Sequence, residues 1–183
     1  MAQNSSVPSD REPSFPRRLT RLQSYDYSQD GAYFITVCTR GRLCLFGDVK
    51  HDAMQPNQCG QAVTDVWNLL SRHFPHVQTF AFSLMPNHVH GVLLFRDVGE
   101  KAACPNRRCQ RHGLPDVVGS FKSYSARAVN HIRDTRGQPV WQRGYYDHVI
   151  RSESSLVRIG EYIANNPLQW NLDHDNPETR GRV

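Results

Sequence analysis

The sequence predicts an α+β fold in which a small antiparallel sheet has helices packed on one face. Segments rich in β-branched and aromatic residues alternate with segments whose apolar residues recur at helical spacing. Their order is strand, helix, strand, helix, strand, helix, and at least two strands follow each other closely along the chain. A ferredoxin-like arrangement is the most economical way to combine these elements.

Three segments are expected to form the strands. Residues 32–40 (AYFITVCTR) are dense in β-branched and aromatic side chains and predict a central strand. Residues 77–95 predict one or two strands interrupted near Pro86, because proline cannot donate to a sheet ladder. Residues 140–150 predict an aromatic-rich strand, and residues 44–50 predict a shorter strand or a turn.

Three amphipathic helices are expected between and after these strands, over residues 57–74, 116–134 and 152–166. Pro75 and Pro167 end the first and the third helix, since proline cannot continue a helix. Asp116 is the candidate N-cap of the second helix and Ser152 that of the third.

Length and composition indicate one domain, with a disordered tail over residues 1–16, a folded domain over 17–172 and a polar tail over 173–183. The formal net charge is +5 and comes mostly from arginine, which suits phosphate binding, although simple solubility explains the charge equally well.

No apolar run approaches the ~18–20 residues of a membrane span. The N-terminus lacks a secretory signal, and the five cysteines are odd in number and scattered. We therefore expect a cytoplasmic protein without membrane contact.

Two histidines in FSLMPNHVHGVLLF are the first candidate for chemistry. Strand side chains alternate between faces, so His88 and His90 point the same way and Val89 points the other way. Two neighbouring imidazoles suit one divalent ion, although two ordinary strand histidines have the same spacing. The apolar context favours a specific role, because an unpaired histidine is costly in a buried strand.

A second candidate lies in EYIANNP, near the C-terminus. Tyr162 and Asn166 are four residues apart, so they share one face of a helix. The Asn166 amide oxygen suits magnesium or manganese, and a phenol beside such an ion is a plausible nucleophile. Taken alone, the helical periodicity favours the simpler interpretation, in which Tyr162 extends an apolar stripe.

The motifs MPNHVHGVL, SFKSYSARAVN, VWQRGYYDHVI and IGEYIANNPLQW follow one another along the chain, after the opening segment SYDYSQDGAYFITVCTR. In this order and spacing the chain resembles the REP-associated tyrosine transposases, which are relatives of the single-tyrosine HUH transposases of insertion sequences. The resemblance covers most of residues 17–172. Five ordered blocks form a far more specific signal than the histidine pair alone.

This resemblance implies a ferredoxin-like domain that binds a divalent metal, Mg²⁺ or Mn²⁺, through His88 and His90. It maps the nucleophile onto Tyr162, which would form a 5′-phosphotyrosine and leave a free 3′-OH without ATP. Asn166 maps onto the third metal ligand. Related enzymes often have glutamine there, and asparagine is one methylene shorter, so Asn165 or a water molecule remains an alternative.

The resemblance also implies substrates, namely hairpins of repetitive extragenic palindromes and the adjoining single-stranded DNA. Phosphate contacts are expected from Arg17, Arg18, Arg21, Lys122 and Arg127. Trp141, Tyr145 and Tyr146 are candidates for stacking on unpaired bases, with core packing as the alternative. His148 either supports the metal site or faces solvent. REP-associated members can work as single chains and insertion-sequence relatives work as dimers, so both a monomer and a homodimer remain open.

Two other functions compete with a DNA strand transferase. One is a hairpin-binding protein of the same fold that is catalytically silent, although both histidines and the tyrosine are present. The other is a structural zinc protein built on Cys104, Cys109 and His112, for which no fourth ligand is evident.

Overall fold

A four-stranded antiparallel sheet forms the centre of the protein. The structure is a computed structural model that describes residues 25–97, 112–173 and 175–180. The sheet has the order β4-β5-β1-β6, and every neighbouring pair is antiparallel. Its strands are β1 (Gly31–Cys38), β4 (Val77–Leu84), β5 (His88–Phe95) and β6 (Tyr146–Ile150). With helical segments between β1 and β4 and a long helix between β5 and β6, this is the expected ferredoxin-like topology.

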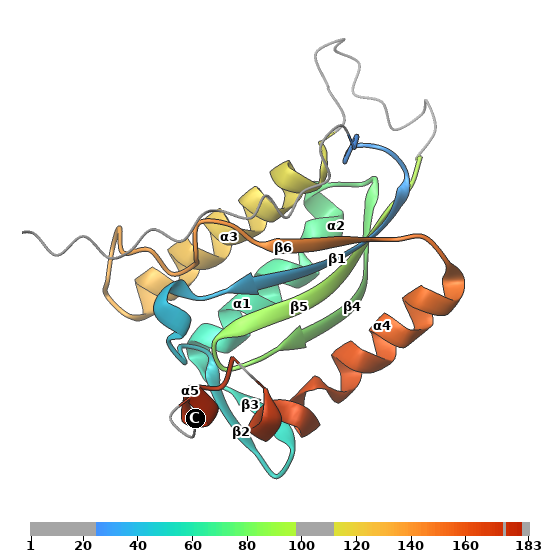
Figure 1. The fold of residues 1–183 in the computed structure, drawn as a ribbon. Helices are drawn as coiled ribbons and strands as arrows, with labels where there is room; N and C mark the ends of the chain where they lie inside the picture. Colours follow the sequence, from blue (N-terminus) through green and yellow to red (C-terminus); the bar gives the residue numbers. More distant parts are fainter. Residues whose placement is uncertain (1–24, 98–111, 174, 181–183) are drawn as a thin grey trace, which may run out of the picture.

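The remaining elements flank the sheet (Figure 1). A short hairpin, β2 (Gly47–Lys50) and β3 (Ala53–Pro56), precedes α1 (Gln58–Asn68) and α2 (Leu70–His73). The long helix α3 (Leu114–Ile132) leads to β6. The chain ends with α4 (Glu153–Asn165), a 3-10 segment η3 (Asn166–Leu172) and α5 (Pro177–Arg180).

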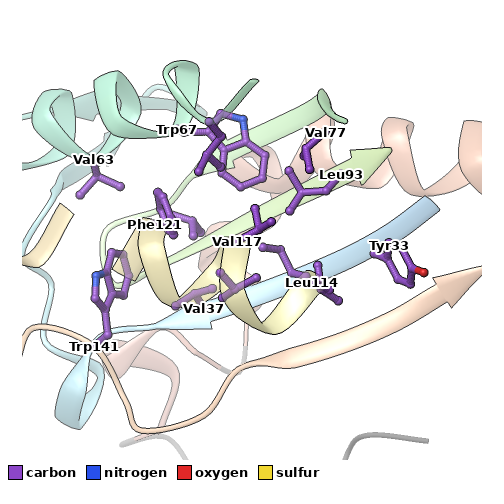
Figure 2. Close-up of a cluster of buried hydrophobic side chains, with 14 of the residues drawn as sticks. Tyr33, Val37, Val63, Trp67, Val77, Leu93, Leu114, Val117, Phe121 and Trp141 are labelled. Atoms are coloured by element: carbon purple, nitrogen blue, oxygen red, sulfur yellow. The ribbon is translucent and has the colours of Figure 1, made fainter. Parts of the chain in front are cut away.

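Helices α1 and α3 cover one face of the sheet and bury the main core (Figure 2). Tyr33, Ile35 and Val37 alternate along β1 toward this face and are fully buried. Trp67 of α1 stacks on Phe82 of β4, with ring centroids 4.8 Å apart. Burying such large apolar side chains is the dominant stabilising contribution to the fold.

Helix α4 packs on the opposite face, which the sequence-based prediction left uncovered. A second cluster joins Val92 of β5, Ile150 of β6 and Ile163 of α4, with Phe34 of β1 packed against it. The apolar stripe of α4 explains this contact, because residues 156, 159 and 163 share one side of the helix. The α+β class is confirmed, and the second helical contact is what places α4 beside the histidine strand.

Several predicted boundaries were wrong for local reasons. The first helix divides after Asn68 into α1 and α2, and Asn57 caps α1 by accepting a hydrogen bond from the Gly60 amide. Asp116 is not the N-cap of α3, because it lies inside the first turn and accepts from the Gly113 amide at 3.1 Å. By contrast, the expected break near Pro86 is confirmed, since this residue lies between β4 and β5, outside both strands.

The predicted strand over 140–150 is also shorter than expected, since β6 begins only at residue 146. Ser152 is confirmed as the cap of α4, where its hydroxyl accepts from the Ser155 amide at 3.2 Å.

The folded domain continues beyond residue 172. Asp175 and Asn176 are only 5% and 4% exposed, and the Asn176 side chain donates to the Trp170 carbonyl at 3.1 Å. The expected polar tail from residue 173 is therefore packed structure as far as α5. None of the described helices combines the length and apolar character that a membrane span requires.

Candidate functional site

The two histidines lie side by side on β5, as strand alternation predicts. His88 is fully buried and His90 is 6% exposed. Their Nε2 atoms are 3.1 Å apart and the ring centroids 4.6 Å apart. Register places them opposite Cys38 and Thr36 of β1. The central position of β5 thus holds both rings in a fixed frame.

Hydrogen bonds at the other ring nitrogen orient both imidazoles. The Nδ1 atom of His88 lies 2.9 Å from Oδ1 of Asn87, and Nδ1 of His90 lies 2.8 Å from Oγ1 of Thr36. Phe34 stacks on the His90 ring at 5.5 Å between centroids. Because both Nδ1 atoms are engaged, both Nε2 atoms converge on the same point.

This convergence fits a divalent ion. Two ligands at about 2.1 Å from one ion, with a right angle between them, are about 3.0 Å apart. The observed separation of 3.1 Å matches that span. Within the described ranges, histidine, cysteine, aspartate and glutamate side chains alone form no cluster of three that could hold a metal ion. A third protein ligand would therefore have to be of another type, such as an amide.

Helix α4 brings Tyr162 against the histidine pair, as expected. The Tyr162 ring centroid lies 5.4 Å from that of His90 and 6.3 Å from that of Phe34. The side chain is 43% exposed, so the phenol can meet a ligand from solvent. Residues separated by more than seventy positions thus meet at one site.

The phenol is held in its neutral form by its surroundings. Burial raises the pKa of Tyr162 above the ordinary value of 10.0, and the negative charges of Asp173 and Asp175 raise it further. A hydrogen bond with the Asn166 side chain opposes this rise in the pKa. Ionisation of Tyr162 to a phenolate would therefore require a positive charge close to the phenol oxygen, because the two nearby carboxylates are negative and oppose it.

Asn166 lies at the junction of α4 and η3, next to Tyr162. It is 2% exposed, and its Oδ1 is buried without a hydrogen-bond partner among the residues that the structure describes. An unpaired buried carbonyl oxygen is unfavourable unless a ligand satisfies it. The alternative residue, Asn165, is exposed. Of the two asparagines, Asn166 has the position and the unused acceptor that a metal ligand needs.

The structure adds four polar residues that the sequence did not single out. Arg42 forms an ion pair with Asp175, and Oδ2 of Asp173 lies 4.0 Å from Nε2 of His88. Asn87 is fully buried between these segments. Asn87 could have been predicted as a site residue, because it directly precedes His88 in the sequence. Arg42, Asp173 and Asp175 reach the site only through tertiary packing.

Arg42, Asp173 and Asp175 border an open cleft of about 590 Å³. The cleft reaches from His90 to the start of β6, and its lining includes Phe34, Thr36, His90, Tyr146, Tyr162 and Asp173. Aromatic rings line it beside polar groups.

The expected DNA-binding residues are placed unevenly. Trp141 is 7% exposed, packs between Phe46 and Phe121, and donates from Nε1 to Ser125 Oγ at 3.0 Å. The prediction that Trp141 stacks on a base is therefore wrong, because the ring is buried against Phe46 and Phe121 in the core. Tyr146 is 49% exposed and lines the cleft.

The basic candidates on α3 differ from each other. Lys122 donates from Nζ to the carbonyls of Gln142 and Gly144 at 2.6 and 3.0 Å, so it holds the segment before β6. Arg127 is exposed and stacks over the Tyr124 ring at 4.5 Å. Arg17, Arg18 and Arg21 lie outside the described residues, as do Cys104 and Cys109 of the zinc alternative. His148 is exposed on β6.

Comparisons with known proteins agree with this arrangement. No protein-family model matches the chain. A protein of Haemophilus influenzae described as an "Uncharacterized protein" is 37% identical over 164 residues, which span 86% of this chain and 91% of the relative. Another H. influenzae protein, described as "Putative REP-associated tyrosine transposase", is 19% identical over 79% of this chain and 74% of its own length.

A solved structure shares the fold. It is a REP-associated tyrosine transposase bound to a REP hairpin, with a TM-score of 0.51 and 19% identity over 86% of this chain and 74% of that one. The ferredoxin-like sheet on which the histidines and the tyrosine of this chain meet is therefore also the fold of a REP-associated tyrosine transposase. The chain is thus similar to REP-associated tyrosine transposases in fold and, at 19% identity, in sequence, and it shares 37% identity with the H. influenzae protein described only as uncharacterized.

Proposed function

We propose that this protein cleaves and rejoins single-stranded DNA at palindromic hairpin repeats through a covalent 5′-phosphotyrosine on Tyr162. The observation that carries the proposal is the exposed phenol of Tyr162, 5.4 Å between ring centroids from His90, at the edge of a cleft. The relative of known fold that is bound to a REP hairpin supports the substrate class.

The chain's residues fit a divalent ion, Mg²⁺ or Mn²⁺, held by His88, His90 and Asn166. The paired Nε2 atoms and the unused Oδ1 of Asn166 supply nitrogen and oxygen donors of the type these ions accept. Such an ion, when bound, draws charge from a phosphate oxygen and stabilises a phenolate.

The side chains then have separate tasks. Tyr162 Oη attacks the scissile phosphorus and loses its proton, while the bond from phosphorus to the 3′ oxygen breaks and that oxygen leaves as a 3′-OH. The Asn166 side chain lies beside the phenol and opposes the rise in its pKa, and Phe34 packs against the rings of both Tyr162 and His90. The covalent bond conserves the energy of the phosphodiester, so a later 3′-OH can reverse the step.

Tyr146 is the side chain best placed to bind an unpaired base beside the cleavage point. Replacing Tyr146 by alanine is expected to weaken single-stranded DNA binding by about tenfold, because base stacking on an aromatic ring contributes about 1–3 kcal/mol. Fluorescence anisotropy with a labelled single strand measures the change. Tyr124→Ala is the matched control, since Tyr124 is equally exposed on α3, away from the cleft. Equal losses in both variants would contradict a specific stacking role.

Incubation of the protein with a labelled hairpin, carrying a single-stranded flank, and Mn²⁺ tests the proposed reaction. We expect a covalent adduct that survives denaturation, that peptide mass spectrometry maps to Tyr162, and that Tyr162→Phe lacks. Tyr124→Phe should form the adduct normally. Tight hairpin binding without any adduct would instead support the silent hairpin-binding protein.

A further inference from the structure

We propose that Asn87 keeps the ring hydrogen of His88 on Nδ1, so that Nε2 of His88 offers its lone pair to a metal ion. The ring hydrogen of His90, by contrast, stays on the metal-binding nitrogen Nε2 until an ion arrives. This inference rests on the proposed role of both histidines as ligands. It concerns which nitrogen of each neutral ring bears hydrogen, a property that hydrogen-bond partners determine.

The first step is the orientation of the Asn87 amide. Its Nδ2 donates to two backbone carbonyls, that of Arg42 at 3.1 Å and that of Asp175 at 2.7 Å. Both amide hydrogens are thereby used. A flipped amide would place Oδ1 against two carbonyl oxygens, all three being acceptors, so the network fixes the amide with Oδ1 toward His88.

The second step passes this constraint to His88. Its Nδ1 lies 2.9 Å from Oδ1 of Asn87, and an amide oxygen can only accept. Nδ1 of His88 therefore bears the hydrogen, and Nε2 presents its lone pair. A metal binds an imidazole through such a lone pair, so His88 is ready without rearrangement.

The third step concerns His90. Its Nε2 lies 3.1 Å from the Nε2 lone pair of His88, and two lone pairs at that distance would repel. The metal-free pair is satisfied if His90 donates from Nε2. Its Nδ1 then accepts from the Thr36 hydroxyl, 2.8 Å away. A hydroxyl can donate or accept, so Thr36 permits either form of the ring.

The consequence is an asymmetric pair. Metal binding requires the His90 hydrogen to move from Nε2 to Nδ1, after which Thr36 Oγ1 accepts it. His88 keeps the same form throughout. Asn87 thus acts as a positioning residue that links a proposed metal ligand to the backbone at Arg42 and Asp175.

Nitrogen NMR of the full chain with ¹⁵N-labelled histidine, at a pH near about 8 where free histidine is neutral, tests the assignment. In the metal-free protein we expect hydrogen on Nδ1 of His88 and on Nε2 of His90, with signals assigned through His88→Gln and His90→Gln. Hydrogen on Nε2 of His88 would overturn the proposal, and so would hydrogen on Nδ1 of His90. With Mg²⁺ added, only His90 should change form. If neither ring responds, the metal-free assignment stands and the proposed metal role fails.

Variants separate positioning from general stability. Asn87→Ala should remove the preference of His88 for hydrogen on Nδ1 and weaken Mn²⁺ binding by about 10–100-fold, measured from free Mn²⁺ by EPR. Asn130→Ala is the matched control, because Asn130 is a buried asparagine that donates to the Gln138 carbonyl at 2.7 Å, away from the histidines. Unchanged His88 signals and Mn²⁺ affinity in Asn87→Ala would refute the role.

Discussion

Replacing His90 by alanine is expected to abolish strand cleavage while hairpin affinity stays unchanged. The loss should reach about a thousandfold, or about 4 kcal/mol of transition-state stabilisation, if the ring is one of the ligands that hold the ion. His88→Ala should behave alike, since the two Nε2 atoms converge on one point. The proposed hairpin binding would rest mainly on phosphate contacts elsewhere on the surface, so it should survive both changes.

Three measurements make this expectation decisive. Cleavage of a labelled strand gives the rate, anisotropy gives hairpin affinity, and thermal unfolding shows whether the buried site still folds. His148→Ala is the control, because His148 is an exposed histidine on the neighbouring strand β6. Cleavage at the wild-type rate by either His88→Ala or His90→Ala would remove that histidine from the site. Equal loss of cleavage and hairpin binding would point to a folding defect instead.

Local rules were enough to predict half of this site. A period of two along a strand places His88 and His90 on one face, and helical spacing places Tyr162 and Asn166 together. Neither rule could bring the two pairs to each other. That proximity follows from the packing of α4 on the second face of the sheet, which only the resemblance to a family anticipated.

The remaining site residues depend on contacts between distant segments. Thr36 meets His90 because of the register between β1 and β5, and Asp173 and Asp175 arrive because the chain folds back after η3. Composition alone predicted a polar tail at that point. The prediction that Trp141 stacks on bases was wrong for a related reason. An aromatic-rich stretch does not reveal which rings are buried and which, like Tyr146, remain exposed.

Gly91→Ala is expected to destabilise the protein, although it adds only one methyl group. Gly91 follows His90 on β5 and points to the opposite face, where Trp67 covers it. A Cβ atom there would lie 2.7 Å from Cζ2 of Trp67, and closer still to Cη2. The indole cannot retreat easily, because it also stacks on Phe82 and meets Phe121 edge to face at 5.6 Å. Overpacking of this kind costs about 1–3 kcal/mol of unfolding free energy.

A second substitution tests whether that clash is the cause. Trp67→Leu alone should cost about 2–3 kcal/mol, somewhat less than the ~3–5 kcal/mol of a buried tryptophan changed to alanine. In the double variant the smaller side chain leaves room for the new methyl group, so the combined loss should fall short of the sum by about 1 kcal/mol or more. Urea unfolding of the four proteins measures this coupling.

Gly119→Ala provides the matched control for the glycine change. Gly119 lies inside α3, and a Cβ atom there would meet nothing within 4 Å, so alanine should stabilise the helix by about 0.5–1 kcal/mol. Additive losses in the Gly91 and Trp67 variants would show that the indole does not limit the space at Gly91. A combined loss smaller than the sum would show that Trp67 of α1 packs directly against the strand that carries the histidines. The spacing of their Nε2 atoms would then depend on a core contact on the far side of the sheet, because β5 is shared by both faces.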